Sequence, residues 1–551
     1  MRVSAPVLLF GCFLSVGFGC AKSDGSGGTG GSSDTGGSSA TGGSSSGGSN
    51  GTTGGSTGTG GNGSGTGGIV TTGTGGTATG GSTGTGGRAT GGSTGTGGSS
   101  STGGSTGTGG SSSTGGSTGT GGTTAACTIT PTSSLSTKIP TVGIVTFTTT
   151  LASPTSASIK FGLDTSYGMT APVDLKQASY RTLLLGMKPS KTYHYQITVT
   201  NSSGSCSSAD QMIATGARPN GNALPTLTIT TNNKAALWGG FLVIGSYQGA
   251  TNQSFILDAD GDFVWWYADG SDGCGTRMSY DGQYMWINNG NVPATTGSTH
   301  VHRVTMDGMT DTDLSTPFNN MSHQIAPLPD GSVAFYASGS NGCDDIKLFP
   351  ANGTASSTST TIVNARTAHG GTGACHVNNI EYSQPDDTLV FSDLDNDCLT
   401  KVSKTTGATV WVLNGNTGGI TSTFTGDLWS GGEHGFHLLS LTDVLLFNNN
   451  NSGSSSQALE LTLDTSAKKS TKKWSYAPTS ATKVMVLGDV QRMTTAGPSG
   501  AGNGNTIVDF GTGDKVHEVD ASGTLLQEIK SQYPFGFMEK RATLYGPPTR
   551  Q

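Results

Sequence analysis

Leu257-Asp-Ala-Asp-Gly-Asp-Phe-Val-Trp265 has the pattern of a strand end, a polar turn with a glycine, and the start of the next strand. Five looser variants of this unit follow along the chain. They begin at Val304, Leu348, Val402, Leu463 and Val519. From Gly261 to Gly523 the units recur about every 52 residues, a spacing that suits a four-stranded blade. The sequence therefore predicts an all-β protein whose residues 219–551 form a six-bladed β-propeller.

Short strands of alternating polarity also fill residues 125–218. The segment Leu185–Tyr193 is similar to the corner before the sixth strand of fibronectin type III-like domains, where a tyrosine hydroxyl bonds to the backbone upstream. Cys127 and Cys206 stand near the two ends of this segment, and we predict a disulfide between them. The sequence thus predicts a small fibronectin type III-like β-sandwich before the propeller.

Glycine is unevenly distributed over the 551 residues. Of the 92 glycines, 44 lie in residues 21–122, mixed almost entirely with serine and threonine. The octapeptide Gly-Gly-Ser-Thr-Gly-Thr-Gly-Gly occurs four times there, beginning at Gly80, Gly91, Gly103 and Gly115. Such a sequence cannot bury a core, so residues 21–124 are predicted to be a disordered tether.

The first 20 residues have the pattern of an export signal. Arg2 precedes an apolar stretch that ends at Phe18, which is too short for a membrane-spanning helix. Gly19-Cys20 resembles the end of a bacterial lipoprotein signal, in which the cysteine is acylated, although Gly17 stands where leucine is usual. We expect a lipid-anchored protein of the outer membrane or cell surface that meets the membrane only through this anchor. A periplasm-facing location, and a cleaved signal with an incidental Cys20, are the alternatives.

The charge balance excludes some partners. The chain has 28 Lys and Arg against 35 Asp and Glu, a net charge of −7, and no basic block. We therefore expect no nucleic-acid partner. No phosphate-binding Walker loop and no Gly-x-Ser-x-Gly elbow occur in the sequence. Nothing in the sequence indicates the oligomeric state.

Three successive repeat units carry a histidine at the same position: His323, His376 and His434. The first strand of each propeller blade lines the axial channel, so these imidazoles are expected to meet at one mouth and form a shared site. We interpret the other histidines as packed or surface residues. They are His194, His300, His302, His369, His437 and His517.

These motifs resemble the PAPS-independent arylsulfotransferase family. The resemblance rests on Ser322-His323, His376-Val-Asn378, Glu433-His434, Phe447-Asn-Asn449 and the closing Tyr533-Pro-Phe segment. It implies that His434 takes a sulfuryl group from an aryl sulfate, forms a sulfohistidine, and passes the group to a phenol. It also implies that His323 and His376 hold sulfate oxygens or handle the phenolic proton, and that Asn378 donates to a sulfate oxygen.

One residue departs from this pattern. The family places an arginine about 18 residues beyond the second histidine, and that position here is Leu394. Leucine cannot replace the bidentate grip of arginine on sulfate. Arg277 and Arg492, on neighbouring blades, are the candidates for this role.

Two other functions fit the same residues. Three histidines could ligate a divalent metal in an open lyase or hydrolase site, although no cofactor is otherwise expected. Alternatively, the propeller is a cell-surface binding module without turnover. The spacings Asp258-x-Asp-x-Asp262 and Asp393-x-Asp-x-Asp397 resemble calcium loops without their glycine. We interpret the first as a strand turn and keep a bound cation as an alternative for the second.

The cysteines complete the prediction. Besides Cys127 and Cys206, the exported part contains Cys274, Cys343, Cys375 and Cys398, and no Cys-x-x-Cys pair that would suggest structural zinc. Three pairings of these four are possible. We predict Cys375–Cys398, which would brace the mouth beside His376, together with Cys274–Cys343.

Overall fold

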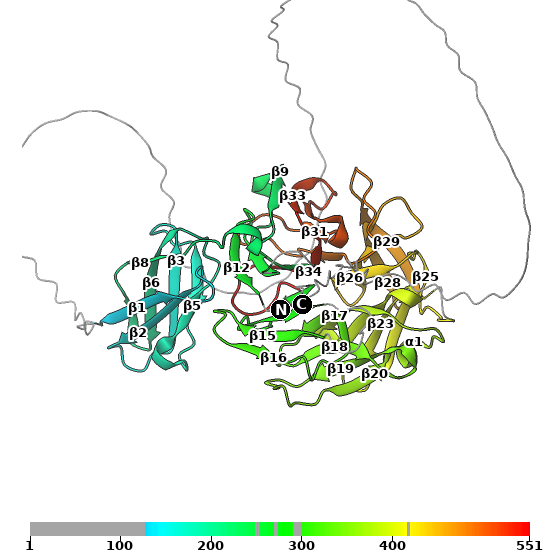
Figure 1. The fold of residues 1–551 in the computed structure, drawn as a ribbon, viewed down its shortest axis with the longest axis horizontal. Coiled ribbons are helices and arrows are strands. Elements are labelled where there is room, and N and C mark those ends of the chain that lie inside the picture. Colours follow the sequence, from blue (N-terminus) through cyan, green and yellow to red (C-terminus); the bar gives the residue numbers. More distant parts are fainter. Residues whose placement is uncertain are drawn as a thin grey trace, which may run out of the picture. The chain divides into compact units, whose positions relative to one another are not determined.

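The computed structural model describes residues 127–247, 251, 253–268, 274–289, 299–415 and 419–550. The predicted signal peptide, Cys20 and the tether lie outside them. Nearly every described element is a strand, so the predicted all-β class is confirmed (Figure 1). Within the described ranges there is one α-helix, α1 (Ala365–His369). None of the helices in these ranges is long and apolar enough to cross a membrane.

Two antiparallel sheets form the first part of the described chain. One contains β1 (Ile129–Leu135), β2 (Gly143–Thr149) and β5 (Thr182–Leu184). The other contains β3 (Ser156–Gly162), β4 (Met169–Pro172), β6 (Thr192–Asn201), β7 (Gly204–Ser207) and β8 (Gln211–Ala214). Alternate residues of both sheets bury one common core that includes Val145, Phe147, Ile159, Phe161 and Ile197.

Two contacts expected from the sequence occur in this part. The backbone N–H of Lys188 donates to the hydroxyl of Tyr193 at 2.8 Å. The predicted Cys127–Cys206 disulfide is confirmed, with the two Cα atoms 5.9 Å apart.

The rest of the described chain consists of sheets whose strands are mostly consecutive in the sequence and mostly antiparallel. The longest sheet runs β12 (Phe263–Tyr267), β11 (Ser254–Leu257), β10 (Phe241–Ser246), β34 (Phe535–Arg541), β13 (Gly275–Met278), β14 (Tyr284–Asn288), β15 (Val301–Thr305) and β16 (Asp311–Asp313). Two four-stranded sheets follow: β17 (Met321–Pro327), β18 (Val333–Ser338), β19 (Asp344–Phe349) and β20 (Thr360–Asn364), then β21 (Val377–Ser383), β22 (Thr388–Asp393), β23 (Cys398–Ser403) and β24 (Thr409–Asn414).

Two further sheets have five strands each. One contains β25 (Thr425–Gly426), β29 (Lys469–Tyr476), β28 (Gln457–Asp464), β27 (Asp443–Asn448) and β26 (Glu433–Leu438). The other contains β30 (Asp489–Arg492), β31 (Thr506–Asp509), β32 (Lys515–Val519), β33 (Leu525–Ser531) and β9 (Leu227–Thr231).

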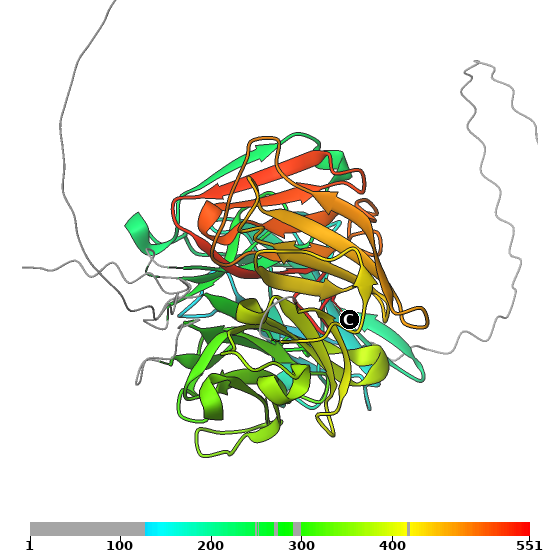
Figure 2. The same cartoon turned by 90° about the vertical axis from the view of Figure 1, so that its right-hand side faces the viewer.

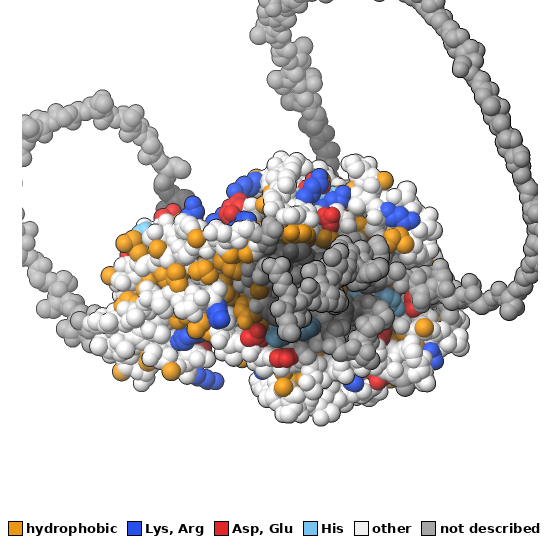
Figure 3. All heavy atoms as spheres, viewed as in Figure 1, with side chains coloured by type: hydrophobic (Ala, Val, Ile, Leu, Met, Phe, Trp, Pro, Cys, Tyr) orange, Lys and Arg blue, Asp and Glu red, His pale blue; other side chains and the backbone are white. Residues whose placement is uncertain are grey.

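One or two strands from each of these sheets surround a common axis. β34 contacts β13, and the contacts continue through β17, β21, β26 and β30 back to β34. Strands from both ends of this region close the ring, because β34 pairs with β10 and β9 pairs with β33. A ring of radially arranged antiparallel sheets is the β-propeller architecture, and the sheets follow one another around it in chain order (Figure 2). On the face shown in Figure 3, basic and acidic side chains form several separate groups.

The turn at Asp258–Asp262 shows why its residues recur in the repeat. Asp258 Oδ1 accepts the backbone N–H groups of Asp260 and Asp262, both at 2.9 Å. Gly261 has a φ of 82°, and a Cβ there would lie 1.9 Å from a side-chain carbon of Ile229. The ammonium group of Lys188 lies 3.0, 2.8 and 2.7 Å from oxygens of Asp258, Asp260 and Asp262. Two of the protein's own ammonium groups, those of Lys188 and Lys234, therefore offset part of the charge of this acidic turn.

The remaining disulfide differs from our prediction. Cys343 is bonded to Cys375, so the predicted Cys274–Cys343 and Cys375–Cys398 pairs are wrong. The backbone N–H of Cys375 donates to the carbonyl of Gly342 at 3.1 Å, which holds the two segments side by side. Cys398 instead begins a strand and packs against Val412 and Ile420. Two disulfides in the described part are typical of an exported protein in an oxidising compartment.

Replacing Lys188 by methionine should lower the free energy of unfolding by about 2 kcal/mol, because three neighbouring carboxylates lose a shared charged donor. Urea denaturation of the two proteins measures the difference. Lys191→Met, on the same connection but exposed, is the matched control and should unfold like the wild type. Equal losses in both variants would contradict a role for the carboxylate contacts.

Candidate functional site

A local irregularity lies at or just beyond each predicted histidine: the shifts in β17 and β26 include His323 and His434, and the shift in β21 follows His376, which immediately precedes that strand. The pairing register shifts between Met321 and Ile325 in β17, between Val377 and Asn379 in β21, and between Glu433 and Phe436 in β26. β-Bulges redirect side chains and are common beside active sites.

These bulged strands bring the three histidines together. The ring centroid of His323 lies 5.2 Å from that of His376 and 6.2 Å from that of His434. His323 and His434 are fully buried, and His376 is partly buried. His323 has a φ of 47°, a strained value of the kind found at functional sites. The sequence predicted this cluster from repeat position alone.

The other described histidines have partners outside the cluster of three, although Asp393, the partner of His369, also accepts the backbone N–H of His376. Their partners are Asp210 for His194, His302 for His300, Asp311 for His302, Asp393 for His369, the Arg492 backbone for His437, and Tyr476 with Glu528 for His517.

Hydrogen bonds define the tautomer of His434. The side-chain amide of Asn449 donates to the carbonyls of Val484 at 2.9 Å and Leu487 at 3.0 Å, so its Oδ1 faces His434. That oxygen lies 2.7 Å from His434 Nδ1 and can only accept, so Nδ1 carries the proton. The lone pair of the ring is therefore on Nε2, which is buried and has no hydrogen-bond partner within the described part of the chain.

Burial keeps all three imidazoles neutral. It lowers the pKa of His434 to about 4, assisted by the charge of His376 and opposed by the Asn449 hydrogen bond and by Asp489. It lowers the pKa of His323 well below the usual value, and His376 and His434 add to this effect. The pKa of His376 is also lowered by burial, against the pull of Asp395 and Asp393. At neutral pH the cluster therefore offers nitrogen lone pairs rather than positive charge.

Asn378 uses both of its polar atoms within the protein. Its Nδ2 donates to the carbonyl of Glu433 at 2.6 Å, and its Oδ1 accepts the hydroxyl of Ser392. These bonds tie β21 to the residue immediately before His434. In this structure Asn378 therefore orients the strand that carries His434.

Leu394 lies at the mouth, as its place in the sequence predicts. Its N–H donates to the carbonyl of His376 at 2.9 Å, and its side chain lies against Gly432. The two candidate arginines are held by carboxylates: Arg277 lies 3.2 Å from Asp489, and Arg492 lies 3.0 Å from Glu460. Both guanidinium groups are thus paired with carboxylates and not with the three histidines.

The mouth beside His376 is acidic. Asp393 Oδ1 accepts the backbone N–H of His376 at 3.0 Å, and Asp397 Oδ1 accepts that of Gly432 at 2.7 Å. Two of the three carboxylates of the calcium-like spacing, those of Asp393 and Asp397, thus support the backbone around the histidines.

Two groups of possible metal ligands occur within the described residues, and the histidine cluster is not one of them. One is Asp258, Asp260 and Asp262, which Lys188 contacts, and the other is His369, Cys375 and Asp393. The Cys375 sulfur is in a disulfide, which removes a thiolate ligand from the second group. The ligand atoms of His323, His376 and His434 do not all approach within 4.8 Å of one another.

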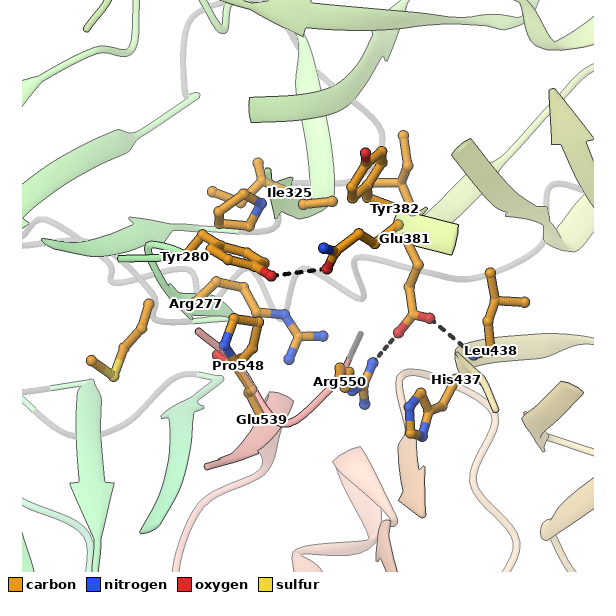
Figure 4. Close-up of a pocket in the computed structure, with 15 residues that line it drawn as sticks. Arg277, Tyr280, Ile325, Glu381, Tyr382, His437, Leu438, Glu539, Pro548 and Arg550 are labelled. Atoms are coloured by element: carbon orange, nitrogen blue, oxygen red, sulfur yellow. Dashed lines mark hydrogen bonds and ion pairs between the residues drawn. The ribbon is translucent and has the colours of Figure 1, made fainter. Parts of the chain in front are cut away.

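A pocket lies toward the far ends of the strands that carry the histidines. Its lining includes Arg277, Glu381, His437, Glu539 and Arg550, together with Tyr280 and Tyr382 (Figure 4). Arg550 donates to Glu381, to Asp489 at 3.1 Å, and to the carbonyls of Phe436 and Val490. Sequence reasoning missed this group, because single charges in distant strands share no repeat position.

No protein-family model matches the chain, and no curated protein matches it. Solved structures with a partial likeness include the periplasmic gluconolactonase of Pseudomonas aeruginosa, at 13% identity over 62% of this chain and 94% of that one, with a TM-score of 0.34. A putative 6-phosphogluconolactonase of Bacteroides fragilis matches at 10% identity over 54% and 98%, with a TM-score of 0.33. The Swd1 β-propeller domain of Myceliophteria thermophila matches at 10% identity over 55% and 88%, with a TM-score of 0.33. Likenesses at this level carry no argument about activity.

Proposed function

We propose that the protein is an exported, lipid-anchored, arylsulfotransferase-like enzyme. It transfers a sulfuryl group from an aryl sulfate to a phenol through a sulfohistidine at His434. The observation that carries the proposal is the buried, neutral imidazole of His434, whose Nδ1–H is held by Asn449 and whose Nε2 lone pair is unengaged within the described residues. A neutral, oriented imidazole is a competent nucleophile at neutral pH.

The finer fold assignments belong to this proposal. In the eight-stranded sheet, one parallel pair, Gly275 with Phe537, joins two four-stranded meanders. Counting these meanders separately gives a six-bladed propeller. The hydrogen bond from Lys188 to Tyr193 favours a fibronectin type III-like sandwich before it. Acylation at Cys20 would attach the protein to the membrane through the tether.

The reaction needs two displacements at sulfur. First, the Nε2 lone pair of His434 forms an N–S bond while the ester S–O bond breaks, and the aryl oxygen leaves with the electron pair. Next, the oxygen of an acceptor phenol forms a new S–O bond while the N–S bond breaks, and the lone pair returns to Nε2. The phenol's proton leaves in this second step, and His376, whose Nε2 is also buried without a partner within the described residues, is the candidate acceptor.

Attack by Nε2 makes the ring of His434 cationic, because Nδ1 keeps its proton. The oxygen of Asn449 stabilises that proton at 2.7 Å, and the negative charge of Asp489 favours the cationic ring. Both effects act on the charge that develops during the reaction, which is where preorganised groups accelerate a step.

His434→Ala should reduce transfer from 4-nitrophenyl sulfate to a phenol by about 10³-fold or more, because the nucleophile is removed. Release of 4-nitrophenol in the presence of acceptor measures the rate. Mass spectrometry of wild type mixed with donor alone should show one added sulfuryl group on the peptide that contains His434.

His302→Ala is the matched control, because His302 pairs with Asp311 away from the cluster. This variant should retain wild-type activity. Full activity of His434→Ala would refute the nucleophile assignment. A wild type that transfers nothing from any aryl sulfate would refute the transferase and favour the binding module.

The wild-type rate should fall only as the pH drops through about 4, where His434 gains a proton and loses its lone pair. In Asn449→Asp, a carboxylate facing Nδ1 stabilises the protonated ring, so the acid limb of kcat/KM should move up by about one unit or more. A pH profile of both proteins gives the comparison. An acid limb unchanged by the substitution would contradict the hydrogen bond that defines the tautomer.

A further inference from the structure

Side chains cap the inner edges of three strands around the axis. The N–H of Ile325 donates to Gln324 Oε1 at 3.2 Å, and the N–H of Ile380 donates to Asn379 Oδ1 at 2.9 Å. In β30 the N–H of Val490 donates to Asp489 Oδ1 at 2.8 Å. In each case the residue immediately before the donor provides the cap.

These caps lie on the axial side of their strands. β17, β21 and β30 each pair with a neighbour on one side only, β18, β22 and β31. Their other edges face the axis of the ring. An N–H group that bonds to a side chain on that edge takes no part in the pairing of the sheet. Gln324 directly follows His323, and Asn379 lies three residues beyond His376. The caps therefore place both carboxamides on the axial edges of two strands, one that contains His323 and one that begins directly after His376.

The amide nitrogen of each carboxamide is not used by the cap. Gln324 and Asn379 are fully buried, and their oxygens are used by the caps. Gln324 Nε2 and Asn379 Nδ2 have no hydrogen-bond partner within the described residues. A buried amide donor without a partner is unfavourable, and a ligand oxygen would relieve it. The Nε2 atoms of His376 and His434 lack described partners in the same way.

The charged cap has cationic partners of its own. Asp489, the third cap, is contacted by Arg277 at 3.2 Å and by Arg550 at 3.1 Å. Its oxygens also accept the N–H groups of Val490 and Met538. The carboxylate therefore has two cationic partners within the protein, while the amide donors of Gln324 and Asn379 carry no charge.

We propose that Gln324 and Asn379 bind the sulfuryl oxygens of the substrate. They would take the role of the arginine for which this chain has Leu394. The inference rests on the proposed function of His434. Two neutral donors suit a singly charged sulfate monoester. An aryl phosphate, close to doubly charged at neutral pH, would lack a compensating cation here and would face Asp393 and Asp395 near His376. The site is thus predicted to select aryl sulfates over aryl phosphates.

The test measures binding separately from transfer. The probe is 4-nitrobenzenesulfonate, whose sulfur is bonded to carbon and cannot be transferred. Calorimetric titration of the wild type, Gln324→Leu and Asn379→Leu should show a Kd about ten-fold or more higher in each variant, because one donor is lost. Gln384→Leu, in the pocket at the far ends of these strands, is the matched control and should bind like the wild type.

Conservative variants keep the test decisive if a leucine variant fails to fold. Gln324→Glu and Asn379→Asp keep the cap oxygen but replace the donor by a carboxylate, so sulfonate binding should be abolished. 4-Nitrophenylphosphonate should bind the wild type more weakly as its second proton is lost.

The outcomes separate the two proposals. Weakened sulfonate binding in the variants supports the donor site even if no aryl sulfate is turned over, a result that would refute only the transferase. Wild-type affinity in all four variants, or no sulfonate binding by the wild type, would overturn the donor site. If the wild type binds no sulfonate but transfers sulfuryl groups through His434, the transferase proposal would still hold.

Discussion

A ring of inner strands leaves one edge of most of these strands without a sheet partner, and the buried N–H groups on that edge must be bonded in another way. In this protein, side chains do it. Gln324 and Asn379 cap their own strands, and Gln491 bonds to both the N–H and the carbonyl of Lys540 in β34. Residues that complete the backbone hydrogen bonding of the propeller are therefore also the residues that face its axis.

Asp489 both caps the backbone of an inner strand and influences the charge of the His434 ring. It caps β30, accepts a backbone N–H from β34, and pairs with Arg277 and Arg550. Gly435, the residue after His434, has no side chain, and a Cβ there would lie 2.1 Å from an oxygen of Asp489. The small residue thus admits a carboxylate whose charge acts on the ring of His434.

Periodicity made part of this protein predictable. The all-β fold and the meeting of His323, His376 and His434 follow from repeat position, which is a local property of the sequence. The Cys343–Cys375 bond depends on which loops of neighbouring sheets meet, and no spacing encodes that. Gln324 and Asn379 stand near the histidines in the sequence. Only the structure shows that their side-chain oxygens accept backbone N–H groups, while their amide nitrogens have no hydrogen-bond partner within the described residues. Arg550 joins Glu381 and Asp489 from three distant segments.

The Cys343–Cys375 bond ends one residue before His376 and joins two neighbouring sheets there. A newly made chain in a reducing compartment lacks this covalent link, so the position of His376 rests on weaker contacts such as the hydrogen bond to Asp393. Oxidation after export would therefore complete the site and the fold together. Completion of the candidate site would in this sense depend on the redox state of a single pair of sulfur atoms.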